Sequence, residues 1–281
     1  YLAPFLVLFA IFTVIPVIMS FYMSFTTYDL INPPVYVGID NYRELFMGDE
    51  IFLLSLQNTF VFAAVIGPVS FFSSFFFAWV ISRLKFRNAF ALAFYAPSVT
   101  SSVAMSVIWL YFFSNDRMGL INNILIWIGI ITRPILWLSD TRTIMLVVMI
   151  VSIWMSMGTG FLVFLAGIQT IPKEYYEAAR IDGIKSGFQE LRFVVWPSMK
   201  PQLLFGSITS IVNAFGIFDI AVSLCGMPSP NYAAHTIVAH LYDYAFIRFD
   251  MGYASAVATI LFLITFFCGR IAMKIFATHD V

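Results

Sequence analysis

The stretch Tyr175–Pro201 reads YYEAARIDGIKSGFQELRFVVWPSMKP, and the rest of the chain is organised around it. It is a long polar segment between two apolar runs. Residues 173–200 include five basic and four acidic side chains. The flanking residues 143–172 and 201–218 contain no charged side chain. Because charged side chains are rare inside a bilayer, this pattern predicts a polar element outside the membrane.

Local signals predict a first short helix in this stretch. Pro172 stands where a first helical position is expected, and Glu174 and Glu177 follow in the first turns. Proline suits that position, and acids suit the positive end of a helix. Asp182 and Gly183 predict the helix stop.

A capping box predicts a second helix. Ser186 is followed three residues later by Gln189, the spacing at which side chains and backbone cap each other. Pro197 is expected to close this helix. The stretch is therefore predicted to form a helix–turn–helix between two membrane spans.

Composition places the chain among polytopic membrane proteins. It is 61% hydrophobic and 11% charged, with a mean hydropathy of +0.91, whereas about a quarter of the residues in soluble domains are charged. The net charge is zero and no basic patch occurs, so no nucleic-acid partner is expected. Tyr1 lies inside an apolar run, so we expect the amino terminus to be truncated.

Charge-free runs predict six membrane-spanning helices, because about 20 apolar residues cross a bilayer. The expected fold class is therefore an all-α integral membrane protein. The predicted helices lie near residues 2–25, 56–82, 88–113, 143–169, 202–224 and 251–275.

Basic residues in the loops predict the orientation. Ten lie on the side of the Tyr175–Pro201 stretch: Arg83, Lys85, Arg87, Lys173, Arg180, Lys185, Arg192, Lys200, Arg270 and Lys274. Five lie on the other side: Arg43, Arg117, Arg133, Arg142 and Arg248. The stretch and both chain ends are therefore expected in the cytoplasm, in a multi-pass protein of a bacterial-type cytoplasmic (inner) membrane.

The stretch Gly119–Trp137 is apolar but short, and Asn122, Asn123, Gly129 and Pro134 interrupt it. We expect an interfacial helix along the outer surface. The alternative is a seventh span, which would place the termini on opposite sides and weaken the charge asymmetry.

The cysteines and histidines do not form a pattern of disulfide or metal chemistry. Cys225 and Cys268 fall near opposite ends of neighbouring predicted spans, so both are interpreted as packing thiols. His235, His240 and His279 lack metal-ligand spacing, and surface or loop positions are expected for them. No metal site is predicted.

The Tyr175–Pro201 stretch resembles the "EAA" signature of permease subunits in binding-protein-dependent ABC importers. The matching residues are Glu177, Ala178, Ala179, Asp182, Gly183 and Pro197. The wider sequence is similar to the sugar, or maltose-type, branch of that family. The similar stretches are VGIDNYRELF (Val37–Phe46), GLINNIL (Gly119–Leu125), GIQTIPKEYYEAARIDG (Gly167–Gly183), Phe218–Asp219 and YDYAFIRFDMGYASA (Tyr242–Ala256).

This resemblance implies a single transmembrane permease domain over residues 1–281, with the architecture of a type I ABC importer. It implies that residues 172–201, named here the EAA segment, form a cytoplasmic coupling segment between the fourth and fifth spans. The implied partners are a second homologous permease, two copies of an ATP-binding subunit, an extracytoplasmic solute-binding protein, the lipid bilayer and a carbohydrate, in particular an oligosaccharide. The residues implied to dock on the ATPase are Glu177, Ala178, Ala179, Asp182 and Gly183.

The residues themselves fit a transport subunit that is not an enzyme. No phosphate-binding loop of the form GxxxxGK[ST] occurs, so no cofactor is expected in this chain, and ATP and magnesium are expected on the partner. Ala178 and Ala179 are small enough to let another surface approach, and Glu177 offers a carboxylate to a basic partner or to Arg180. The alternative is a solvated loop with ion pairs inside the helix.

Polar groups inside spans are candidates for a solute pathway, because they are costly in lipid and tend to face a cavity. Asp219 is the acid within a predicted span, and it lies beside Asn213, Phe215 and Phe218. Either its carboxylate faces the pathway, or it lies at headgroup level and bonds to backbone or water.

Hydroxyls and aromatic rings complete the candidates. The hydroxyls that follow Pro97 either shape the pathway or bond their own backbone. Trp154 and Phe161 either stack on a sugar ring or belong to the lipid-facing aromatic residues. The hydroxyl candidates are Ser98, Thr100, Ser101 and Ser102.

An ion-coupled secondary transporter or a channel is the alternative function. Such proteins show intramembrane acids or histidines and often contain inverted repeats. Asp219 alone fits that description in this sequence, and no repeat is visible, so the alternative is the weaker of the two.

Overall fold

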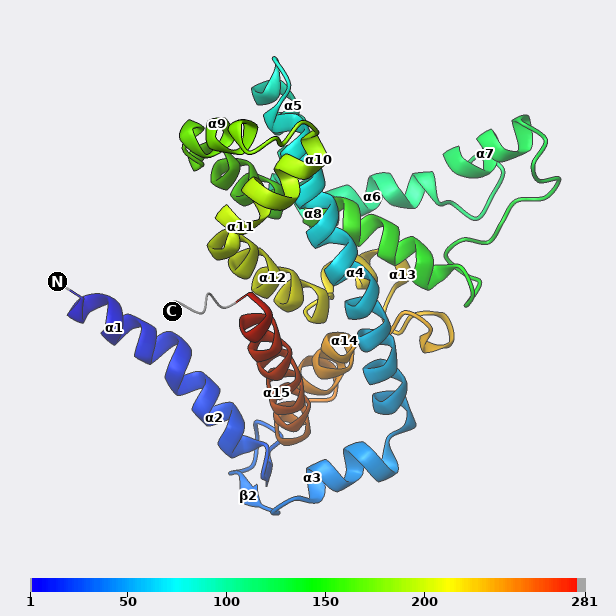
Figure 1. Ribbon diagram of the computed structural model, residues 1–281. Helices are drawn as coiled ribbons and strands as arrows, with labels where there is room; N and C mark the ends of the chain where they lie inside the picture. Colours follow the sequence, from blue (N-terminus) through cyan, green and yellow to red (C-terminus); the bar gives the residue numbers. More distant parts are fainter. Residues whose placement is uncertain (1, 277–281) are drawn as a thin grey trace.

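The computed structural model describes residues 2–276, and these residues are mostly helical (Figure 1). Two short strands, β1 (Thr26–Thr27) and β2 (Val35–Tyr36), pair antiparallel. The helical elements are α1 (Ala3–Phe9), η1 (Ala10–Val14), α2 (Ile15–Met23), α3 (Asp40–Arg43), η2 (Glu44–Gly48), α4 (Glu50–Ser82), α5 (Arg87–Val99), α6 (Ser102–Phe112), α7 (Leu120–Trp127), α8 (Ile144–Thr170), α9 (Lys173–Ile181), α10 (Gly187–Glu190), η3 (Leu191–Val195), α11 (Trp196–Ser198), α12 (Lys200–Phe215), α13 (Asp219–Cys225), η4 (Pro230–Tyr232), α14 (Ile237–Tyr242), η5 (Asp243–Ile247) and α15 (Met251–Phe276).

Among the described residues, five helices are long and apolar enough to cross a membrane, or six if the bent pair α5–α6 is one span. The predicted helical membrane fold is thus confirmed. The five are Ala3–Met23, Glu50–Ser82, Ile144–Thr170, Lys200–Cys225 and Met251–Phe276.

The second span begins earlier than the predicted residue 56. The Asp49 carboxylate accepts a hydrogen bond from the Phe52 N–H at 2.8 Å and so caps α4 at Glu50. This cap satisfies one of the free N–H groups at the start of a helix.

The centre of the bundle is the contact of α4 with α8 and α12. Buried phenylalanines fill it, with Phe62, Phe161 and Phe164 almost completely enclosed. The first span differs: no residue of its apolar window is buried, and Figure 1 shows α1 pointing away from the other helices, while α2 approaches α15.

The third span is not the continuous helix predicted over residues 88–113, because α5 and α6 meet at a bend of 98°. Pro97 has no N–H to donate. The hydroxyls of Ser98 and Thr100 donate to backbone carbonyls three and four residues before them, at 2.8 and 3.0 Å. These side chains replace backbone donors, so the chain leaves the helix at Thr100, whose ψ is 141°.

The fifth span is also interrupted, although it was predicted as one helix over residues 202–224. The α12 helix ends at Phe215, and α13 begins at Asp219. The Thr236 hydroxyl donates to the Ile217 carbonyl at 2.9 Å. A side chain from elsewhere in the chain thus satisfies the interrupted backbone, as burial in a membrane protein requires.

The stretch Gly119–Trp137 forms a shorter helix than predicted, because α7 ends at Trp127. Asn122 is completely buried there. Its amide nitrogen lies 3.0–3.1 Å from three loop carbonyls, and its oxygen accepts from the Ile135 N–H and the Trp137 indole N–H. Asn122 therefore fixes the loop after α7, and this stretch is not among the helices long enough to span in the described part of the chain.

Candidate functional site

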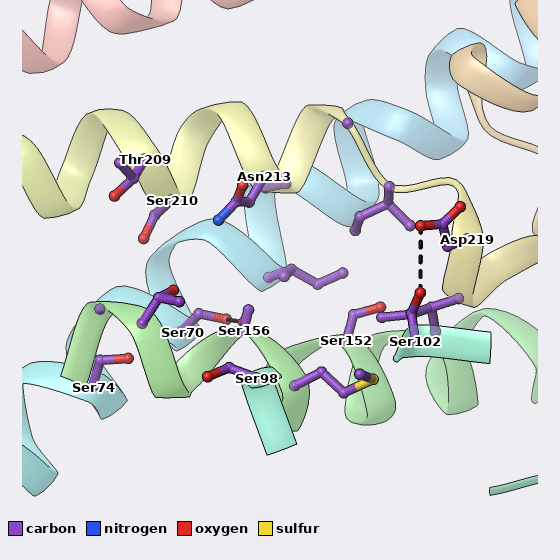
Figure 2. A pocket seen from close by; sticks show the side chains of 18 of the residues that line it. Ser70, Ser74, Ser98, Ser102, Ser152, Ser156, Thr209, Ser210, Asn213 and Asp219 are labelled. Atoms are coloured by element: carbon purple, nitrogen blue, oxygen red, sulfur yellow. Dashed lines mark hydrogen bonds between the residues drawn. The ribbon is translucent and has the colours of Figure 1, made fainter. Parts of the chain in front are cut away.

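A polar cavity of about 270 Å³ lies among α4, α5, α6, α8, α12 and α13. Asn213 and Asp219 contribute an amide and a carboxylate to its wall, and Figure 2 shows polar side chains of α12 facing those of α8 across it. The remaining polar lining consists of hydroxyl groups, from Ser70, Ser74, Ser98, Ser102, Ser152, Ser156, Thr159, Thr209 and Ser210.

Helical spacing gathers these hydroxyls on the faces that meet. Ser70 and Ser74 are four residues apart on α4, as are Ser152 and Ser156 on α8, so each pair shares one face of its helix. The hydroxyls of Ser70 and Ser156 lie 2.6 Å apart. These four serines were not among the predicted pathway residues, although their spacing inside charge-free runs was the available signal.

Asp219 stands at the break in the fifth span, opposite the break in the third. The Ser102 hydroxyl donates to Asp219 Oδ2 at 3.4 Å, a long hydrogen bond (Figure 2). Asp219 and Asn213 are both exposed and line the cavity. Membrane proteins tolerate interrupted helices where the backbone lines such a cavity, and the two breaks place their polar side chains there.

The structure brings only some of the predicted pathway residues together. Asp219, Asn213 and Phe218 line the cavity. Of the four hydroxyl residues that follow Pro97, Ser98 and Ser102 also line the cavity.

The other candidates do not line this cavity. Phe161 is completely buried and stacked on Phe94, with ring centroids 5.4 Å apart. Trp154 packs edge-on against a tryptophan of α6, and Phe215 packs in the same way against a phenylalanine of α4. Ser101 is exposed at the bend before α6 and is not part of the cavity wall.

In the EAA segment, α9 ends at the predicted stop. Asp182 is the C-cap residue, and Gly183 has a φ of +88°. The Gly183 N–H donates to the Arg180 carbonyl at 3.1 Å, and the next N–H donates to the Ala179 carbonyl at 3.0 Å. These are the paired bonds of a Schellman motif. Pro172 lies one position earlier than predicted, as the N-cap residue.

One face of α9 is open to the surroundings. Ala179 is buried against the chain itself, with 8% of its surface exposed, so Ala178 alone of the two alanines is accessible. Within the described residues Glu177 makes no ion pair with Arg180. Most of α9 is exposed, and four of its exposed residues share one side because they are spaced by three and four positions; these four are Glu174, Glu177, Ala178 and Ile181.

Ile181 also belongs to this face, although it was not among the predicted docking residues. A large apolar side chain at the end of α9, it is 88% exposed. Its position seven residues after Glu174 was the available signal, since i and i+7 share a helix face.

The capping box in the second half of the EAA segment is confirmed. The Ser186 hydroxyl accepts from the Gln189 N–H, and the Gln189 side-chain oxygen accepts from the Ser186 N–H, both at 3.1 Å. Pro197 does not close the helix as predicted, because helical turns continue to Ser198. Pro197 follows the π-helical turn η3, in which backbone hydrogen bonds span five residues instead of four. This local change accommodates the N–H group that proline lacks.

A family model described as "Binding-protein-dependent transport system inner membrane component" matches residues 70–279. This chain belongs to that family. It is a multi-pass permease component of a transport system, and not itself an enzyme.

Relatives of this permease cover nearly its whole length. YesP of Bacillus subtilis (strain 168), a probable ABC transporter permease protein, is 34% identical over 100% of this chain and 89% of YesP. AraP of the same organism, an arabinooligosaccharides transport system permease protein, is 31% identical over 97% of this chain and 86% of AraP. LacF of Rhizobium radiobacter, a lactose transport system permease protein, is 31% identical over 94% of this chain and 88% of LacF.

Two crystal structures share the fold of this permease. One is a bacterial ABC transporter involved in the import of the acidic polysaccharide alginate, with a TM-score of 0.80 over 97% of this chain and 93% of that chain. The other is a bacterial alginate ABC transporter in complex with an alginate pentasaccharide-bound periplasmic protein, with a TM-score of 0.81 over 99% of this chain and 94% of that chain. Both are 23% identical to it. The predicted permease fold of an ABC importer is confirmed.

At the start of α4 the permease buries a charged cluster, which we name the Asp49 cluster. Asp49 Oδ2 accepts from the Tyr253 hydroxyl at 2.7 Å and from the Tyr244 hydroxyl at 3.1 Å. It also lies 3.2 Å from His240 Nε2. Asp49, Tyr244, Tyr253 and His240 thus join α4, η5, α15 and α14 at one point.

The histidines were expected at the surface or in loops. His235 does lie in a loop, although it is only 4% exposed. The expectation is wrong for His240, which lies in α14 and is 2% exposed. His279 is outside the described residues. Over residues 2–276 no group of three or more His, Cys, Asp or Glu side chains is placed to hold a metal ion, and Cys225 and Cys268 are free thiols.

The environment shifts the pKa values of the cluster. Burial alone raises the pKa of Asp49, but hydrogen bonds from Tyr253 and the Phe52 N–H, with the nearby His240 and Tyr244, outweigh burial and lower it. Burial lowers the pKa of His240 despite the neighbouring Asp49. The Asp49 cluster therefore combines an ionised carboxylate with a neutral imidazole at neutral pH.

Acidification is expected to destabilise this region through His235. Burial, helped by His240, lowers the pKa of His235 to about 4, whereas an unfolded histidine has a pKa of about 6.5. Between these values the unfolded chain takes up a proton that the folded chain does not. The contribution of His235 to the free energy of unfolding is therefore fully present above about pH 6.5. Between about pH 6.5 and pH 4 it falls by up to about 1.4 kcal/mol per pH unit.

Thermal melting of wild type and His235→Gln in detergent, from pH 7.5 to pH 4.5, tests this expectation. The melting temperature of the variant should fall less steeply with acidification than that of the wild type. Equal slopes would show that His235 does not contribute.

Proposed function

We propose that this chain is the permease subunit of an ATP-driven ABC importer that translocates a carbohydrate, in particular an oligosaccharide, delivered by an extracytoplasmic solute-binding protein. The cavity lining carries the proposal. Its hydroxyls, Asn213 amide and Asp219 carboxylate offer donors and acceptors to sugar hydroxyls, while Phe218 adds apolar surface. Binding sites commonly combine apolar walls with a few polar groups in this way. The sugar names of AraP and LacF support the same solute class.

Besides the solute-binding protein, the assembly proposed for this single permease domain (residues 1–281) contains two kinds of partner in the bilayer and at its cytoplasmic surface. A second homologous permease pairs with the chain. Two copies of an ATP-binding subunit hold ATP and magnesium, since the sequence lacks a phosphate-binding loop. The EAA segment and both chain ends lie on the cytoplasmic side, in agreement with the basic loops.

Coupling to the ATPase is assigned to the open face of α9. Glu177, Ala178 and Asp182 are exposed and provide the docking surface. Ala179 is buried and instead attaches α9 to the chain, and Gly183 sets the direction in which the backbone leaves. Closing of the ATPase pair moves α9 and switches the cavity between the two sides of the membrane.

Co-purification and reconstitution test this function. The importer proposal requires a stoichiometric ATPase in the purified assembly and ATP-dependent uptake of oligosaccharides into proteoliposomes. A chain that moves solute alone, driven by an ion gradient, would favour the secondary transporter or channel instead.

Asp219→Asn is expected to raise the KM of uptake by about threefold to tenfold, with little change in the maximal rate. A hydrogen bond to a charged group contributes about 1.5–3 kcal/mol when buried, and the exposure of Asp219 in the cavity reduces this. Initial uptake rates in proteoliposomes measure the effect. Asp140→Asn, an exposed acid before α8 and outside the cavity, is the control. An unchanged KM would assign Asp219 a structural role.

A further inference from the structure

Arg83 ties the end of α4 to the second half of the EAA segment. It is the C-cap residue of α4, and its Nη2 donates to Glu190 Oε1 of α10 at 2.7 Å. The guanidinium carbon also lies 4.6 Å from the centroid of the Trp79 ring. Arg83 thus has one partner on each element, an ion pair with the segment and a cation–π contact with α4.

Gly187 gives the guanidinium room to lie against α10. A Cβ at Gly187 would come within 2.7 Å of Arg83 Nη1. A second, apolar contact joins α4 to the EAA segment. The Trp196 ring of α11 packs edge-on against Phe75 of α4, with ring centroids 5.2 Å apart. The EAA segment therefore holds α4 at two places, one polar and one apolar.

The α4 helix connects this contact to the cavity. Ser74 and Ser70 line the cavity, and no proline lies between them and Arg83, since Pro68 is on their far side. Ser74 is nine residues from Arg83, about 14 Å along a helix. Over such a short regular stretch, a displacement of Arg83 displaces the serines as well.

We propose that the Arg83–Glu190 pair is a positioning contact that transmits movement of the EAA segment to Ser70 and Ser74 in the cavity. The inference rests on the proposed function. The side chains of Arg83 and Glu190 are 40% and 26% exposed, and ion pairs with this exposure add little to stability. The contribution of the pair is therefore to hold α4 and α10 together while both move.

The test uses the intact transporter, reconstituted with its partner subunits in proteoliposomes, and compares uptake, ATP hydrolysis and thermal melting. Arg83→Glu and Glu190→Arg each place like charges together. Each is expected to lower the amount of oligosaccharide moved per ATP hydrolysed by at least about fivefold, with the melting temperature nearly unchanged. The double variant R83E/E190R reverses the pair and is expected to recover at least half of the wild-type ratio.

Arg87→Glu is the matched control, because it reverses an exposed arginine four residues after Arg83, at the start of α5, that makes no ion pair in the described residues. The proposal is overturned if the single variants keep the wild-type ratio, or if the double variant is no better than either single one. It is also overturned if Arg87→Glu lowers the ratio equally. A wild-type assembly that moves no carbohydrate with ATP would instead refute the proposed function, and the inference with it.

Discussion

Replacing Gly183 with valine is expected to lower uptake by the assembled transporter at least about tenfold, while the chain still inserts into the membrane. The φ of Gly183 is +88°, a value that a β-branched residue adopts at a cost of about 1–3 kcal/mol. A Cβ at this position meets no atom of residues 2–276 within 4 Å. Backbone strain is therefore the whole penalty, and the last turn of α9 relaxes to relieve it, which disturbs the proposed docking face.

The matched control is Gly129→Val. Gly129 has a φ of +83°, and its Cβ would also meet nothing within 4 Å among the described residues. It ends α7 with the same pair of backbone hydrogen bonds that ends α9. The backbone strain caused by valine is thus the same at Gly129 as at Gly183, but Gly129 lies outside the EAA segment. Gly183→Asn should keep more uptake than Gly183→Val, since asparagine tolerates a positive φ.

ATP-dependent uptake into proteoliposomes, normalised to the amount of permease in the membrane, measures these variants. Wild-type uptake by Gly183→Val would contradict the coupling role. An equal loss in Gly129→Val would show that any strained helix end disturbs the transporter.

The features that could be predicted from the sequence are determined by residues close together in the chain or by one long apolar run. Gly183 and Ser186 act on backbone groups three to five residues away, so a helix stop and a capping box need no knowledge of the fold. The spans follow from charge-free runs for the same reason. Pro97 indicated a kink, but not its size, because the 98° bend also depends on how neighbouring hydroxyls bond.

The features that could not be predicted depend on which face of a helix meets which neighbour. In α8, Phe161 and Ser156 lie in one apolar run, and the run does not show that the serine faces the cavity and the phenylalanine the core. The burial of His240 depends on partners still further away. Asp49 and Tyr253, which bond beside it, are 204 residues apart in the chain.

Replacing Asp49 with alanine is expected to destabilise the permease by about 3–5 kcal/mol, with a fall in melting temperature of roughly 10 °C. The Asp49 side chain is 9% exposed and accepts three hydrogen bonds. Its loss removes the N-cap of α4, for about 1 kcal/mol, and leaves the hydroxyls of Tyr244 and Tyr253 without their acceptor, for about 1–3 kcal/mol each. Thermal melting in detergent measures the effect.

Asp40→Ala is the control for Asp49→Ala. Asp40 lies nine residues before Asp49, at the start of α3, but its side chain is 68% exposed and its ion pair with Arg43 spans 3.7 Å at the surface. Its removal should change stability by less than about 0.5 kcal/mol. Melting of Asp49→Ala within the range of Asp40→Ala would contradict a structural role for the Asp49 cluster.

A double-mutant cycle with Tyr253→Phe separates hydrogen bonding from packing in this cluster. Phenylalanine keeps the ring, which is stacked on Tyr244 with centroids 4.1 Å apart, and loses only the hydroxyl that donates to Asp49 at 2.7 Å. In the wild type this change should cost about 1–2 kcal/mol, whereas in Asp49→Ala the hydroxyl already lacks its acceptor, so its removal should cost nothing further or restore some stability. Additive losses would mean that the two side chains act independently, and the bond between them would then not hold α15 to the start of α4.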